Sequence, residues 1–365
     1  MGRPSGPHRR RTRIPRRDQS RDRVPRRLIE DLGPRSASGN SLASGSSNRQ
    51  GGAVSTNHRL QWAALPVHIR ELLADCVGSA VVDFTSATSG YSPALAGVAT
   101  LADGRSVFIK AASPAQNPDT PDIMRTEADN NLKLKHHRAP APRLLERIDD
   151  GTWVILIFEA IAGHTPGAPW NDHDLSAVLD ALDLVRTLPV TTLPAAATVF
   201  GTIFGGWNRL RDHDPAWESG LDDANMVWWQ PRLDELCSLE RASLASIAGD
   251  SFVHADIRSD NTLVTEDSSA VFVDWTTCCR GASWLDIASM AASVSLEGGS
   301  QPQELLARSR VDISSEDLIA FVTGMSGYFV HASRCPPPPG MPTVRDHQRE
   351  KGVITTTWLR QLLNG

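Results

Sequence analysis

The sequence has no uninterrupted apolar run of the ~18 residues that a membrane-spanning helix needs. It has only five cysteines, an odd number, at spacings that do not match a zinc site. We therefore expect no membrane partner, no disulfide framework and no zinc domain. The cysteine content fits a reducing cytoplasm, and the start also lacks the apolar core of a signal peptide, so we expect a cytoplasmic protein.

Lysine is also scarce, and charge is unevenly distributed. The chain has four lysines, Lys110, Lys133, Lys135 and Lys351, and its net charge is −5. Residues 1–35 alone hold twelve arginines and four acids, so the rest of the chain is acidic. An acidic body argues against nucleic acid as the partner of the folded part.

The amino-terminal segment differs in composition from the rest. Residues 36–57 are rich in Ser, Gly and Asn and carry almost no large apolar side chain. Such a segment cannot bury enough surface to offset its ordering entropy, so we predict a disordered tail over residues 1–58. Two alternatives stay open: translation starts near Val54, or the arginine-rich tail binds a polyanion and is itself the functional part.

The chain is long enough for about two domains of ~150 residues, and its first globular part favours a small sheet. A strand is expected over 81–84, and Asp103-Gly104 separates two apolar runs, which is a strong hairpin signal. A helix over 124–136 and a buried strand over 153–158 complete this part. We place an amino-terminal lobe at residues 59–160.

The second part, residues 161–365, favours helices. Leu175, Val178, Leu179, Leu182 and Val185 form a helical stripe that Asp172 could cap. Further helices are expected around 233–247, from Ser314 to about Phe329, and from about Val344. The sequence therefore predicts a larger, mainly helical lobe.

The most informative stretch is 252–275. His254, Asp256 and Asn261 precede two β-like runs that flank a turn, and Asp274 ends the second run. Because a hairpin brings its two ends together, these oxygen-bearing side chains can converge. Asn261 and Asp274 would suit Mg²⁺, which prefers hard oxygen ligands and substrate phosphates, while Asp256 could accept a proton from an attacking hydroxyl.

This spacing, H-x-D-x-x-x-x-N followed by an apolar strand that ends in Asp-Trp, resembles the aminoglycoside phosphotransferase family. The resemblance implies an α+β, protein-kinase-like fold of two lobes, a small antiparallel sheet lobe and a larger helical one. It also implies ATP and Mg²⁺, with Asp256 as catalytic base and Asn261 and Asp274 as metal ligands. His254 would pin the loop, and Asp286 would brace it through hydrogen bonds.

Lys110 ends the strand-like run 106–109, where its ammonium could pair with ATP phosphates. It needs a carboxylate to hold it, and Glu127 on the following helix is the nearest candidate, with Asp122 and Asp129 as rivals. In the family such a strand lysine and helix glutamate form a pair.

Two further segments would contact the nucleotide. Residues 86–92 occupy the place of a phosphate-covering loop, with Ser89, Gly90 and Ser92 as candidates. An ordinary polar turn is the alternative, since the family's usual pair of glycines is absent. By resemblance, Glu159 and Ile161 belong to the hinge whose backbone would bond the adenine.

The sequence therefore predicts a cytoplasmic ATP- and Mg²⁺-dependent phosphotransferase acting on a hydroxyl of a small molecule. A catalytically silent nucleotide-binding or regulatory protein on the same fold is the alternative. The acidic, tryptophan-rich stretch 212–229 would suit a cationic amine acceptor, or is a solvated loop with core tryptophans. The acceptor stays open, and a monomer is the default.

Overall fold

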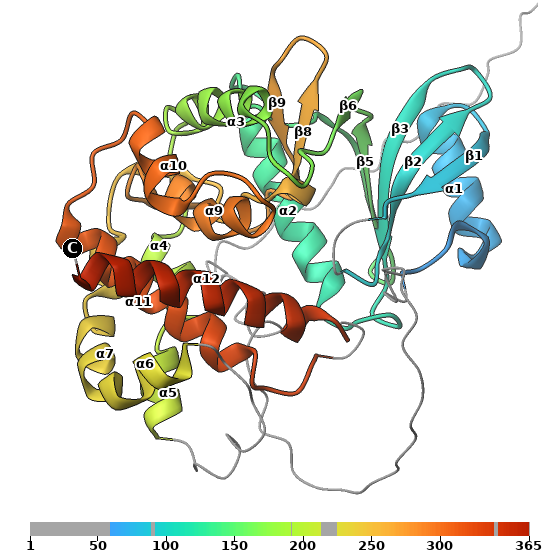
Figure 1. Ribbon diagram of the computed structural model, residues 1–365. Helices are drawn as coiled ribbons and strands as arrows, with labels where there is room; N and C mark the ends of the chain where they lie inside the picture. The colour runs from blue at the N-terminus through green and yellow to red at the C-terminus, as the bar shows by residue number, and fades with distance from the viewer. Residues whose placement is uncertain (1–58, 89–91, 191, 213–224, 339–341, 365) are drawn as a thin grey trace, which may run out of the picture.

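The computed structural model describes residues 59–88, 92–190, 192–212, 225–338 and 342–364. An antiparallel sheet lies on one side of the molecule and a set of helices on the other (Figure 1). No helix in these ranges combines the length and apolar character needed to cross a bilayer. The expected tail, residues 1–58, lies outside them.

The sheet has five strands in the order β1-β2-β3-β5-β4, and every neighbouring pair is antiparallel. The strands are β1 Val81–Ser86, β2 Leu95–Leu101, β3 Ser106–Ala112, β4 Leu144–Asp149 and β5 Val154–Glu159. The predicted hairpin is confirmed: β2 pairs with β3, and Gly104 takes the positive φ of 85° that its turn requires.

A helix covers each face of this sheet, which explains why β5 is apolar at nearly every position. Helix α1, Val67–Val77, buries Ile69 and Leu73 against one face, together with Ile155 and Ile157 of β5. Helix α2, Thr120–Leu134, packs Met124 and Ala128 on the other face, with Val154, Leu156 and Phe158. A strand buried on both faces reads as a continuous apolar run rather than an alternating one.

The structure corrects two expectations for this part. Helix α2 begins at Thr120, four residues before its predicted start, with Pro121 in its first turn. Strand β4 was not predicted, because Glu146, Arg147 and Asp149 dilute its apolar pattern at the edge of the sheet.

The helical part begins beyond the sheet. Its helices are α3 Asp172–Val185, α4 Ala196–Phe200, α5 Gly206–Arg211, α6 Met226–Trp229, α7 Leu233–Glu240, α8 Ser243–Ser246, α9 Leu285–Leu296, α10 Pro302–Arg308, α11 Ser315–Ala332 and α12 Val344–Asn364. Helix α11 packs against α5, α7, α8 and α12, so it is the central element of this part (Figure 1).

The predicted α3 stripe is largely buried, with Leu179 only partly covered. Asn171, not Asp172, caps this helix: its side chain accepts a hydrogen bond from the Asp174 N–H. The cap at Ser314 is confirmed, since its hydroxyl accepts from the Asp317 N–H. These bonds satisfy donors that a helix start leaves unpaired.

Short strands frame the segment that carries the motif. Strand β8, Thr262–Thr265, pairs with β9, Ala270–Phe272, and with β6, Gly163–His164, while β7, Ser251–Val253, pairs with β10, Cys279–Gly281. The expected β8–β9 hairpin is confirmed. It stands beside α3 and next to the sheet (Figure 1), so the motif lies between the two parts of the molecule.

Replacing Gly206 with Ala should destabilise the helical part. An added Cβ would lie 2.0 Å from the backbone oxygen of Gly327 on α11, so α5 and α11 would have to separate. We expect the free energy of unfolding to fall by about 2 kcal/mol or more in urea denaturation. Gly167→Ala is the control, because nothing lies within 4 Å of its Cβ; equal losses in both variants would contradict the close approach.

Candidate active site

An ion pair links the sheet to α2. Lys110 lies on the same face of β3 as Phe108 and Ala112, the face that α2 covers. Its Nζ donates a hydrogen bond of 2.7 Å to Glu127 Oε1, and the Glu127 side chain is only 4% exposed. A charge-assisted bond in such a buried place is strong and fixes the ammonium in position.

The two rival carboxylates have other partners. Asp122 pairs with Arg125, and Asp129 pairs with Arg147 at 2.6 Å. Of the three candidates on this helix, Glu127 is therefore the one that the structure brings to Lys110.

The ammonium also faces the helical part. Lys110 Nζ lies 3.9 Å from Asp274 Oδ1, although 164 residues separate them in the chain. Burial opposes the charged form of Lys110, but Asp274 and Glu127 outweigh it and raise the pKa of this lysine. Lys110 therefore stays protonated beside Glu127 and Asp274, while burial raises the pKa of Glu127 to about 7 against the attraction of Lys110.

Asp286, at the start of α9, holds the loop that carries His254 and Asp256. Its carboxylate is 5% exposed and accepts two backbone N–H bonds of 2.8 Å, from His254 and from Ala255. Ala255 has a φ of 68°, a left-handed conformation that a side chain rarely adopts. The two bonds hold this strained turn, and such strain is typical of functional sites.

His254 is fully buried and ties the loop to the end of β9. Its Nδ1 accepts from the Asp256 N–H at 3.3 Å, so Nε2 carries the proton and donates to the Val273 carbonyl oxygen at 3.1 Å. Burial lowers the pKa of His254, so the ring is neutral. The ring therefore connects the loop of Asp256 to the residue before Asp274.

Asp256 lies at the tip of this loop, with its side chain 35% exposed. Asn261 Nδ2 donates to Asp256 Oδ2 at 3.0 Å, and Arg258 lies 3.4 Å from Oδ1 while it pairs with Asp260 at 2.9 Å. Burial raises the pKa of Asp256 to about 6, although Arg258 acts in the opposite direction. A carboxylate with this pKa is ionised at neutral pH and can still accept a proton.

Asp274 follows β9 with a φ of 64° and accepts a hydrogen bond from Thr276 Oγ1. Burial disfavours its charge, but Lys110 outweighs this and lowers the pKa of Asp274. The adjacent backbone is anchored to α2, because Asn130 Nδ2 donates to the Trp275 carbonyl oxygen at 2.8 Å.

The oxygen atoms of Asn261 and Asp274 suit a hard metal ion that takes its remaining ligands from water or substrate. Asn261 directs its amide nitrogen to Asp256, which leaves Oδ1 for a metal, and the Asp274 carboxylate is 40% exposed. The described residues contain no cluster of three His, Cys, Asp or Glu side chains that could hold a metal. Two oxygen ligands suit Mg²⁺, which is usually held by one or two carboxylates together with waters and substrate phosphates.

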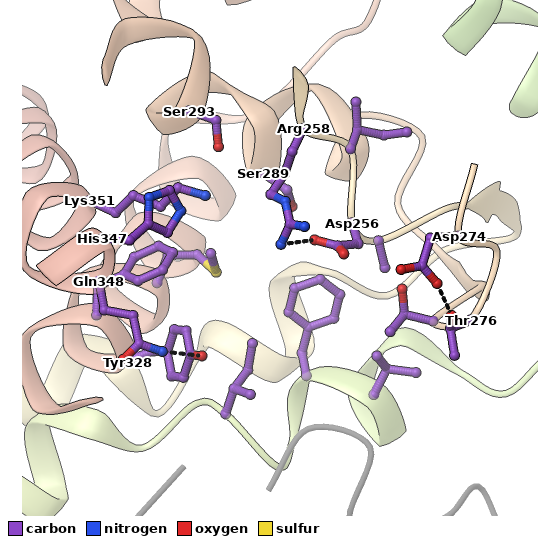
Figure 2. A pocket seen from close by; sticks show the side chains of 18 of the residues that line it. Asp256, Arg258, Asp274, Thr276, Ser289, Ser293, Tyr328, His347, Gln348 and Lys351 are labelled. Carbon is purple, nitrogen blue, oxygen red and sulfur yellow. Dashed lines mark hydrogen bonds and ion pairs between the residues drawn. The ribbon is translucent and has the colours of Figure 1, made fainter. Parts of the chain in front are cut away.

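A cavity of about 250 Å³ opens beside these groups, and Figure 2 shows its lining. Asp256 and Asp274 line one side. The opposite side is formed by α11 and α12, through Tyr328, His347 and Lys351. A reactive carboxylate thus borders a space large enough for a small organic group.

The remaining predicted residues are placed as follows. Ser89 and Gly90 lie outside the described residues, and the Ser92 hydroxyl accepts from the Ala94 N–H at 3.3 Å. Glu159 ends β5 and pairs with Arg143 at 2.6 Å, and Ile161 follows outside any strand.

The acidic, tryptophan-rich stretch was a candidate for binding the acceptor. Residues 213–224 lie outside the described ranges. Of the rest, Trp229 is fully buried, and neither Asp212 nor Trp228 lines the cavity.

Sequence reasoning missed the groups on the far wall. Tyr328, His347, Gln348 and Lys351 lie on helices whose apolar pattern gave no sign of which polar side chains face inward. The one available signal was that Lys351 is the only lysine of the predicted helical lobe.

The fold and this site define a protein of the kinase-like class, with an antiparallel sheet on one side and helices on the other. A family model described as the phosphotransferase enzyme family matches residues 83–317. The chain belongs to this phosphotransferase family, and the expected fold is confirmed.

Solved structures of similar fold share little sequence with this chain. Spectinomycin phosphotransferase APH(9)-Ia, in complex with ADP and spectinomycin, is 13% identical with a TM-score of 0.53, over 82% of this chain and 98% of that one. Aminoglycoside phosphotransferase APH(4)-Ia, a thermostable mutant with ADP and hygromycin B, is 13% identical with a TM-score of 0.52, over the same shares. Choline kinase LicA from Streptococcus pneumoniae is 14% identical, with a TM-score of 0.52 over 81% and 99%. A search of curated proteins gave no match.

Replacing Asp286 with Asn should loosen the motif loop. The amide keeps the shape but presents an N–H₂ group to one of two buried backbone donors. Leaving such a donor unpaired costs about 1–3 kcal/mol, which urea denaturation would measure as a loss of unfolding free energy. Asp180→Asn, on an exposed position of α3, is the control; a loss no larger than that of the control would mean that Asp286 does not brace the loop.

Proposed function

We propose that this protein is an ATP- and Mg²⁺-dependent kinase that transfers the γ-phosphate to a hydroxyl of a small molecule. The observation that carries the proposal is the convergence of Lys110, Asp256, Asn261 and Asp274 between the sheet and the helical part. Membership of the phosphotransferase family supports it, and so does the presence of ADP in similar structures. In this proposal residues 59–160 bind the nucleotide and residues 161–365 carry the catalytic groups.

In the proposed mechanism the acceptor enters the cavity and directs its hydroxyl to Asp256. The carboxylate takes the hydroxyl proton as the acceptor oxygen bonds to the γ-phosphorus, and the bond from that phosphorus to ADP breaks. Lys110, held by Glu127, pairs with phosphate oxygens and limits their movement. Most of the rate gain comes from positioning and charge neutralisation, since phosphoryl transfer needs little covalent help.

The metal would be held by Asn261 Oδ1 and the Asp274 carboxylate. When bound, Mg²⁺ neutralises charge on the phosphates. Lys110 lies 3.9 Å from Asp274 Oδ1 and lowers the pKa of this carboxyl group, which keeps it ionised and able to bind a cation.

Asp256→Asn should nearly abolish turnover while leaving the fold intact. An amide cannot accept the hydroxyl proton, and general-base catalysis contributes roughly 10²–10⁴-fold to rate. ADP release with a panel of hydroxylated compounds measures this, and circular dichroism checks the fold.

The control is Asp250→Asn, which removes a carboxylate that is 85% exposed and pairs with Arg280. Near-normal turnover in Asp256→Asn would exclude Asp256 as the base. Nucleotide binding without ADP release on any compound would instead favour a silent nucleotide-binding protein.

Glu127→Gln should weaken nucleotide binding. Lys110 loses its charged partner and the bond that orients it, so we expect the KM for MgATP to rise about tenfold, as the loss of ~1.4 kcal/mol would produce. Asp129→Asn, on the same helix but paired with Arg147, should leave this KM within about twofold. Equal effects in the two variants would count against the Lys110–Glu127 pair as part of the nucleotide site.

A further inference from the structure

The far wall of the cavity holds a buried cation that forms no ion pair with any described residue. Lys351, on α12, is 6% exposed and lines the cavity opposite Asp256 (Figure 2). Within the described ranges its Nζ has no hydrogen bond or ion pair, and it lies over the face of the Phe329 ring, 5.7 Å from the ring centre. Taking an ammonium out of water without a partner is costly, so a ligand that pairs with it would relieve that cost.

Lys351 is charged at neutral pH. Burial and the nearby Arg258 together lower the pKa of this lysine to about 8, against the attraction of Asp256, Asp260 and Glu297. A group with this pKa is mostly protonated at pH 7. Arg258 itself is already paired with Asp260 and Asp256, so Lys351 is the cation among the described lining residues that is left for a ligand.

The rest of the wall also favours an anion. Apart from Asp256 and Asp274, which belong to the reaction centre, no described lining residue is acidic. Ser289 adds a buried hydroxyl that has no hydrogen-bond partner in the described chain. Burial lowers the pKa of His347 to about 3, so this ring is neutral and adds no charge.

The side of the cavity between these polar groups is apolar. Val199, Phe200 and Ile203 face it from α4 and the following turn, and Met325 and Phe329 face it from α11. Apolar surface of this kind binds a hydrocarbon body, and the volume of about 250 Å³ limits its size.

We propose that the acceptor is a small hydroxylated molecule with an apolar body and an anionic group, a carboxylate or phosphate, that binds Lys351 while its hydroxyl faces Asp256. This inference rests on the proposed kinase function. It differs from the cationic amine acceptor that the acidic, tryptophan-rich stretch suggested; residues 212 and 225–229, the described part of that stretch, do not line the cavity.

A matched series of probes tests the charge of the acceptor. The probes are trans-4-hydroxycyclohexanecarboxylate, its phosphonate counterpart, its carboxamide and trans-4-aminocyclohexanol, which share the ring and hydroxyl and differ in charge. Binding to the MgADP-loaded protein is measured by calorimetry, and turnover is measured as ADP release from MgATP. We expect an anionic member to bind at least tenfold more tightly than the carboxamide and the amine; the better of the two anions distinguishes carboxylate from phosphate recognition.

Substitutions on α12 test whether the preference for anionic probes depends on Lys351. Lys351→Gln should remove the anion preference, and Lys351→Arg should keep most of it. Because Lys351→Gln removes a buried unpaired charge, it should not lower the free energy of unfolding. Arg349→Gln is the matched control, since it removes a positive charge that is 44% exposed and pairs with Asp346 on the same helix. Its anion preference should equal that of the unmodified protein.

The outcomes separate this inference from the proposed function. Equal or tighter binding of the carboxamide or the amine, or an anion preference that survives in Lys351→Gln, would overturn the inference and leave the kinase proposal standing. Anion binding that depends on Lys351, without ADP release for any probe or for a wider panel of alcohols, would support the anion site and count against the kinase function.

Discussion

The Lys110 ammonium is held between carboxylates from two distant parts of the chain, and the arrangement of the site depends on this interaction. Glu127 binds it within the sheet-containing part, at 2.7 Å, and Asp274 approaches it from the helical part, at 3.9 Å. Burial raises the cost of every one of these charges, so none is stable there alone. The contact between Lys110 and Asp274 therefore defines where the two parts meet, and both side chains would border a phosphate with its bound cation.

Much of the fold could be predicted from the sequence, and the exceptions have physical causes. The Asp-Gly hairpin and the cap at Ser314 were predictable because local chemistry decides them. Strand β4 escaped prediction because an edge strand with exposed charges lacks a clear period. The start of α2 was placed too late because its first turn carries polar residues and Pro121 rather than apolar ones.

The residues of the site also divide into those that could be predicted from the sequence and those that could not. Asp256, Asn261 and Asp274 could be proposed together because a hairpin brings its ends together, and the structure places them side by side. The cavity wall formed by α11 and α12 could not be predicted, because the contact between these helices depends on tertiary packing and leaves no local pattern in the sequence. Lys351 illustrates this: its burial beside Phe329, which places an ammonium in the cavity wall, becomes visible only when the two helices are packed together.

A crystal structure of the protein with Mg²⁺ and a non-hydrolysable ATP analogue would test the central claim most directly. The account predicts that the Lys110 ammonium contacts phosphate oxygens, and that the cation lies about 2.1 Å from oxygens of Asn261 and Asp274. It also predicts that the terminal phosphate faces Asp256 across the cavity. A nucleotide bound elsewhere, or bound here with its phosphates directed away from Lys110 and Asp274, would contradict the account.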